Sequence, residues 1–138
     1  MADTGRYSSW NRAYPGLEHI HQGPNILVVR DFFTPEECAA LVSKAGTALS
    51  RSVVRSSTRG SHRTSSGAVV AQREIPTLVQ KMCELLNCDA TRLERCSLIR
   101  YRRGEYYKPH CDEDEGADSM NGFSASHRLV TLQVLLNT

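Results

Sequence analysis

The chain has 138 residues, of which 40% are apolar, and a formal net charge of +2. This length suits one globular domain that buries roughly two-thirds of its unfolded surface. The net charge is too small to indicate by itself that the protein binds nucleic acid or an acidic membrane. No apolar run reaches the length of a signal peptide or a membrane span, so we expect a soluble, unsecreted and by default cytoplasmic protein. Five cysteines without a CxxC pair argue against a disulfide framework and a zinc ribbon.

The amino-terminal part of the chain predicts an arm, a short strand and a helix, in that order. Residues 1–24 are polar, contain several glycines and prolines and show no sustained period, which is typical of an arm or linker. Residues 26–29 form a β-branched run. Thr34 and Glu37 then have the spacing of a capping box, with a proline at the first helical position between them. We expect this helix to reach about Ala48 and to turn one apolar face inward.

A basic, hydroxyl-rich segment follows between residues 49 and 67. It contains four arginines and no acidic residue. Two interpretations remain open: a solvated loop, or a surface that meets an extended polymer such as a peptide or a nucleic acid. The segment has no aromatic residue, which disfavours base stacking.

The remaining pattern predicts a second helix and several strands. Pro76 opens an amphipathic helix whose apolar stripe, a core face, ends near Asn87. Alternation from Leu93 to Gly104 predicts a mixed strand, and residues 128–136 form the best strand of the chain. Two helices followed by strands predict an α+β domain whose sheet part is a barrel or jelly roll. A sheet of only three or four strands would leave the apolar strand at 128–136 uncovered. Either another chain therefore completes the sheet or the domain is incomplete.

The segment YYKPHCDEDEG contains a candidate metal site. On a strand, His110 and Asp112 point to the same face, and imidazole with carboxylate suits Fe(II) in a facial arrangement. The alternative is a loop histidine beside solvated acids. A calcium loop starting at Asp112 would need glycine and glutamate where Ala117 and Phe123 stand, and Cys111 cannot share the face of His110 to bind zinc.

Four sequence blocks together resemble the catalytic domain of the prolyl 4-hydroxylases, over residues 31–137. They are DFFTPEEC, RTSSG, LIRYRRGEYYKPHCDEDE and RLVTLQVLLN. The resemblance implies a partial dioxygenase domain at 25–138, with amino-terminal helices packed on an incomplete double-stranded β-helix, or jelly-roll, core. It also implies an Fe(II)- and 2-oxoglutarate-dependent enzyme, aided by ascorbate, that hydroxylates peptidyl proline to 4-hydroxyproline. The partner is then a proline-containing peptide or protein, not a nucleic acid or a membrane.

The resemblance assigns roles to individual residues. His110 and Asp112 match the proximal iron ligands and are the expected catalytic residues. Tyr101 matches a tyrosine whose hydroxyl contacts the 2-oxoglutarate carboxylate, and Thr131 lies on the strand that lines the same pocket. A phenol can donate a hydrogen bond to such an anion. The positions that match contacts to a proline-rich peptide are Arg63, Ser65, Glu94, Tyr107 and Arg128.

The chain also departs from the pattern of this family. Cys111 replaces an aromatic residue, Leu135 replaces a tyrosine, and the distal iron-binding histidine and the lysine that pairs with 2-oxoglutarate are absent, so we expect an amino-terminal portion of such an enzyme. His62 and His127 are disfavoured as substitutes because a facial triad needs rigidly positioned ligands. Three alternatives stay open: a non-catalytic fragment that binds proline-rich peptides, an oxygenase of the same superfamily that acts on nucleic acid, and a truncated chain that does not fold stably.

Overall fold

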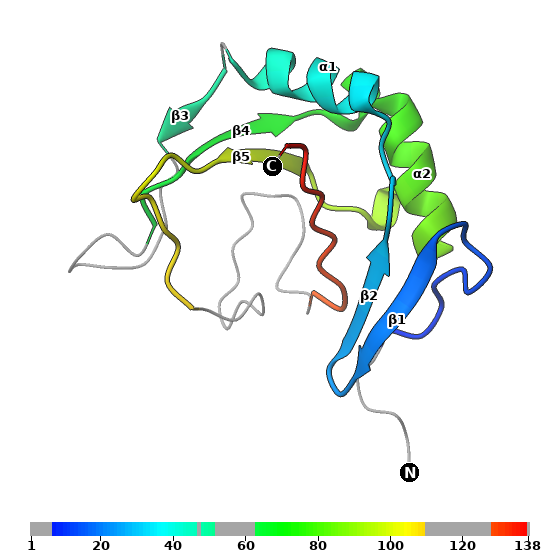
Figure 1. Cartoon of the computed structure of the whole chain (residues 1–138). Coiled ribbons are helices and arrows are strands. Elements are labelled where there is room, and N and C mark those ends of the chain that lie inside the picture. Colours follow the sequence, from blue (N-terminus) through cyan, green and yellow to red (C-terminus); the bar gives the residue numbers. More distant parts are fainter. Residues whose placement is uncertain (1–6, 47, 52–62, 110–127, 138) are drawn as a thin grey trace.

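The computed structural model describes residues 7–46, 48–51, 63–109 and 128–137. Within these ranges the chain is a mixed α+β structure, as predicted, with a two-stranded and a three-stranded antiparallel sheet, the latter in the order β3-β4-β5 (Figure 1). None of the described helices is both long and apolar enough to cross a membrane. The elements in chain order are β1 (Leu17–Gln22), β2 (Asn25–Val29), α1 (Pro35–Gly46), β3 (Ser50–Arg51), β4 (Ser66–Val70), the 3-10 turn η1 (Gln72–Glu74), α2 (Pro76–Leu86), the 3-10 turn η2 (Ala90–Arg92) and β5 (Cys96–Arg100).

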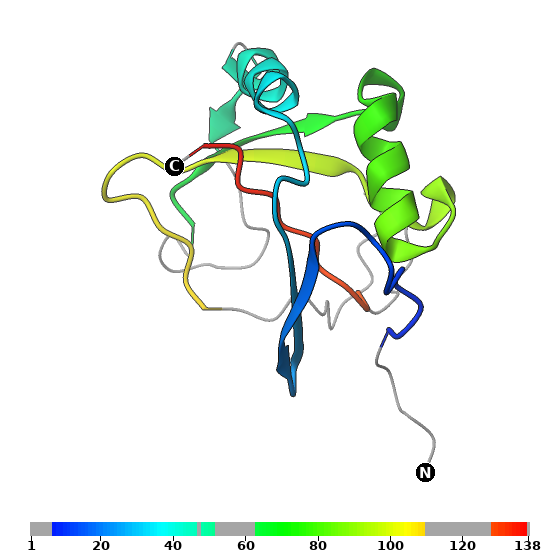
Figure 2. The same cartoon turned by 45° about the vertical axis from the view of Figure 1, so that its right-hand side comes forward.

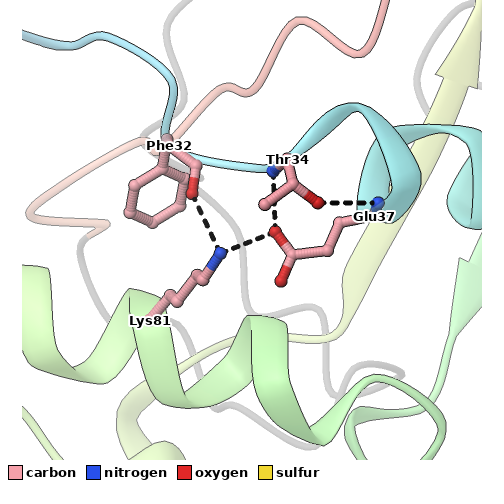
Figure 3. A network of polar contacts seen from close by, with 4 residues as sticks. All are labelled: Phe32, Thr34, Glu37 and Lys81. Atoms are coloured by element: carbon pink, nitrogen blue, oxygen red, sulfur yellow. Dashed lines mark hydrogen bonds and ion pairs between the residues drawn. The ribbon is translucent and has the colours of Figure 1, made fainter.

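The start of α1 confirms the predicted capping box and ties it to α2 (Figure 3). The Glu37 backbone N–H donates to Thr34 Oγ1 at 3.2 Å, and the Thr34 backbone N–H donates to Glu37 Oε2 at 2.8 Å. Lys81 of α2 donates from Nζ to the same Glu37 oxygen at 2.6 Å and to the Phe32 carbonyl at 3.4 Å. A local motif that orders one helix end therefore also fixes the position of the second helix.

The Glu37 carboxylate gives the first testable prediction. The hydrogen bond from Lys81, and after it the bond from the Thr34 backbone, hold the pKa of this carboxyl below its ordinary value of 4.5. A carboxyl whose pKa is lower in the folded chain stabilises the fold above its ordinary pKa, and this stabilisation is lost as the pH falls through the folded value. We therefore expect Glu37→Gln to lower the urea midpoint at neutral pH, and the difference from the parent chain to shrink below pH 4.5.

The matched control for this experiment is Glu36→Gln, because Glu36 is the exposed neighbour on the same helical turn. This variant should leave the urea midpoint close to that of the parent. A loss of stability in Glu37→Gln that stays constant into strong acid would contradict an ionic contribution from Glu37.

The second helix confirms the sequence pattern closely. Pro76 occupies its first turn, and Asn87 adopts a left-handed conformation at its carboxyl end (φ 49°). Its buried side chains join residues from α1 and the end of β4 in one core, since a helix with a single apolar stripe must pack that stripe against other elements. The buried members of this core cluster are Leu41, Val70, Ile75, Leu78 and Val79.

The three-stranded sheet packs only one of its faces on the helices. Val70 is buried in the core, and its pairing partner Cys96 and Leu98 pack partly against that core. On the opposite face Val69 is 62% exposed and Ile99 is 48% exposed. Both views show α1 on one side of β4 and β5 (Figures 1 and 2). We call the face that carries Val69, Ser97 and Ile99 the open face.

The prediction of a strand at residues 128–136 was wrong for the described chain. The structure assigns no strand in residues 128–137, although Leu136 packs partly against the core and Leu135 is 78% exposed. Alternating apolar residues specify which side chains are buried, but a strand also needs a neighbour that shares its ladder of hydrogen bonds. Most residues of this segment are exposed, and Leu136 is its contact with the core cluster.

Residues 7–22, which the pattern assigned to an arm, pack on the rest of the chain. Leu17–Gln22 pairs with β2 as an antiparallel strand. The Asn11 backbone N–H donates to the Leu85 carbonyl at 2.7 Å, and the Tyr7 hydroxyl donates to the Leu86 carbonyl. Periodicity missed β1 because five of its six residues are exposed, so no apolar alternation marks the strand.

Candidate functional site

The predicted iron ligands lie outside the described residues. This holds for both His110 and Asp112, so their metal role remains a prediction. Among the residues that the structure does describe, no group of three histidine, cysteine, aspartate or glutamate side chains could hold a metal ion. The geometry of the site therefore comes from the residues predicted to bind the cosubstrate and the peptide.

Three of the predicted peptide-binding residues form one cluster, which we call the Arg63 cluster: Arg63, Ser65 and Tyr107. Arg63 Nε donates to Ser65 Oγ at 2.6 Å, and the Arg63 guanidinium carbon lies 4.8 Å from the centroid of the Tyr107 ring. The Arg63 and Tyr107 backbones form an antiparallel bridge. Next to it, the Thr64 N–H donates to the Tyr106 carbonyl at 2.9 Å. The segments around residues 64 and 106 are thereby joined at one place.

The Arg63 guanidinium is held by two different kinds of contact. Ser65 is completely buried, so its hydroxyl oxygen is a fixed acceptor away from solvent. The aromatic face of Tyr107 attracts the cation through its quadrupole. Nε is engaged by Ser65, and within the described residues no hydrogen bond from the terminal guanidinium nitrogens is seen, so these nitrogens can donate to planar acceptors such as peptide carbonyls.

The two other predicted peptide-binding residues form a pair of their own. Arg128 donates from Nε to Glu94 Oε1 at 2.7 Å and from a terminal nitrogen to Oε2 at 3.0 Å, a bidentate arrangement. Glu94 lies between η2 and β5, whereas Arg128 begins the segment 128–137. Arg128 thus pairs with another residue of the predicted site.

The Arg63 cluster and the Glu94–Arg128 pair lie at opposite ends of the β4–β5 ladder. Ser66 pairs with Arg100 at the end next to the cluster, and Val70 pairs with Cys96 at the end next to Glu94. Five strand residues span roughly 17 Å. The open face lies between the two groups of residues, and the distance along it suits an extended peptide.

Tyr101 follows β5 directly and continues the alternation of the open face. Ile99 and Tyr101 are both 48% exposed, and side chains two residues apart along a strand share a face. This alternation predicts that Tyr101 shares the face of the sheet that the helices leave uncovered. Thr131 is exposed within residues 128–137, and its role in the same pocket remains a prediction.

One residue that no sequence pattern singled out joins the two 3-10 turns. Gln72 donates from Nε2 to the Ala90 carbonyl at 3.2 Å and to the Leu93 carbonyl at 3.1 Å. The two acceptors are 18 and 21 residues further along the chain. A lone glutamine carries no local signal for such contacts, because only the tertiary fold brings its partners within reach.

Comparison with known proteins finds a distant similarity to a prolyl 4-hydroxylase. The chain is 30% identical to prolyl 4-hydroxylase 1 of Arabidopsis thaliana over 129 residues, with 86% of this chain and 45% of that protein covered. The resemblance first seen in the motifs is thereby confirmed as a distant relationship, and the chain spans just under half the length of the curated relative it matches. No family model matches the chain, and no solved structure matches it.

Proposed function

We propose that the chain is part of an Fe(II)- and 2-oxoglutarate-dependent dioxygenase that hydroxylates peptidyl proline. The observation that carries this proposal is the 30% identity with a prolyl 4-hydroxylase. The gathering of predicted peptide-binding residues at both ends of the open face supports it. In this proposal residues 25–138 belong to a double-stranded β-helix domain, His110 and Asp112 are the iron ligands, and ascorbate assists.

Each residue around the open face then has a definite task. Bound iron would supply the oxidative chemistry, while the protein orients the reactants. The Tyr101 hydroxyl donates a hydrogen bond to a carboxylate of 2-oxoglutarate, and Thr131 contributes to the same pocket. An extended proline-rich peptide has carbonyls without internal partners, so the terminal nitrogens of Arg63 can donate to them.

The direct test is the fate of a proline-rich peptide incubated with Fe(II), 2-oxoglutarate, ascorbate, oxygen and a protein that joins the chain to a segment with the distal histidine and the 2-oxoglutarate-binding lysine. We expect mass spectrometry to find one added oxygen atom on proline, together with succinate, and neither product when 2-oxoglutarate is omitted. A peptide with alanine in place of proline is the matched control. Peptide binding that ignores iron and 2-oxoglutarate, with no oxygen transfer, would contradict an enzymatic role and indicate a peptide-binding fragment.

A further inference from the structure

An open pocket of about 560 Å³ lies where β4 passes into η1 and where η2 leads into β5. Its apolar lining includes Val69 and Leu93, and Gln72 braces its wall by bonding to carbonyls on both sides of η2. Val69 also belongs to the open face and is 62% exposed. The pocket is therefore continuous with the open face, at the end where the Glu94–Arg128 pair lies.

The unpaired charge at this pocket is positive. Arg73 and Arg95 both line it and are exposed, and no carboxylate in the described part of the chain forms an ion pair with either. The one acid in the lining, Glu74, is already engaged: Oε1 lies 3.0 Å from Lys44 Nζ, and Oε2 accepts from a backbone N–H at 3.0 Å. The neighbouring Glu94 is engaged by Arg128. Two guanidinium groups thus remain for an incoming anion.

We infer that the substrate polypeptide carries acidic residues beside its proline-rich stretch, and that this pocket holds them. The inference rests on the proposed function, since it places the peptide along the open face. Arginine binds carboxylates through two parallel hydrogen bonds, and the apolar lining suits the methylene groups of aspartate and glutamate. No aromatic residue lines the pocket and Glu74 borders it, both of which disfavour a nucleic acid.

The inference can be tested by fluorescence anisotropy with the full chain and two labelled peptides. Both peptides have the same proline-rich stretch, but one is flanked by glutamate and the other by glutamine. At low ionic strength we expect the acidic flank to tighten binding about three- to tenfold, because solvent-exposed ion pairs are individually weak. The gain should shrink as salt is added.

Removing the two arginine charges of the pocket tests whether the gain in affinity from the acidic flank arises there. The double variant Arg73→Gln/Arg95→Gln should lose the gain from the acidic flank and bind the neutral peptide as the parent does. Arg92→Gln is the matched control, because Arg92 is an exposed arginine of η2 that does not line the pocket. This variant should keep the gain.

The outcomes separate the inference from the proposed function. If the neutral peptide binds but the acidic flank adds nothing, or the double variant keeps the gain, the inference is overturned and the proposed function stands. If neither peptide binds, both are overturned. A single-stranded oligonucleotide that binds this pocket more tightly than the acidic peptide, with binding lost in the double variant, would also overturn the inference.

Discussion

Replacing His110 by alanine is expected to abolish the visible charge-transfer band that appears when the chain is titrated with Fe(II) and 2-oxoglutarate without oxygen. In the proposed function His110 and Asp112 hold the iron, and loss of one ligand from a site built on so few side chains removes most of its affinity. Absorption spectroscopy under anaerobic conditions measures the band directly. Asp112→Ala should have the same effect for the same reason.

His127→Ala is the control for this titration, because His127 is a nearby histidine in sequence that we do not assign to the iron. The variant should keep the band. Loss of the band in His127→Ala alone would contradict the ligand assignment, and absence of the band from a folded parent chain would contradict iron binding by this chain.

Arg63→Met is expected to weaken the binding of a proline-rich peptide by about tenfold, the size of loss that is common when an interface arginine is removed. The substitution removes the hydrogen bond to Ser65, the cation above the Tyr107 ring and the donors that we assign to peptide carbonyls. Arg63→Lys should recover only part of the affinity, since an ammonium group cannot donate to Ser65 and to the peptide in a planar arrangement. Titration calorimetry or anisotropy measures both variants.

A second measurement separates this loss of binding from a loss of stability. The Ser65 hydroxyl is fully buried, so Arg63→Met removes its donor and should cost about 1–3 kcal/mol in the free energy of unfolding. The double variant Arg63→Met/Ser65→Ala also removes the buried hydroxyl that has lost its donor. Urea unfolding should therefore show that much of the stability returns, whereas the affinity for the peptide should stay low. Recovery of peptide binding in this double variant would contradict a direct role for Arg63 in binding.

The two helices were predictable from the sequence because their determinants are local. Thr34 and Glu37 are three residues apart and bond to each other's backbone, and Pro76 and Asn87 mark the ends of α2 through their own backbone preferences. Such signals act within one turn of helix and need no other part of the chain. The apolar stripe of α2 likewise specified its buried face before any partner was known.

The strands were predicted less well, because a strand depends on its neighbour. The best strand pattern, at residues 128–136, has no assigned strand, whereas the exposed β1 formed beside β2 without an apolar signal. Propensity and alternation describe how side chains are divided between two faces, but the pairing is decided by whichever segment lies alongside.

For the site, the sequence by itself determined which residues were candidates, and it did so only through the order of several motifs that resemble one family. The tertiary structure decided which of them meet: it brought Arg63 to Tyr107 and Glu94 to Arg128, and it left Tyr101 half-exposed. Residues 34 positions apart, such as Glu94 and Arg128, carry no local signal of their contact. Their proximity depends on how the segment 128–137 is placed against the rest of the domain, where Leu136 packs partly against the core and buries apolar surface.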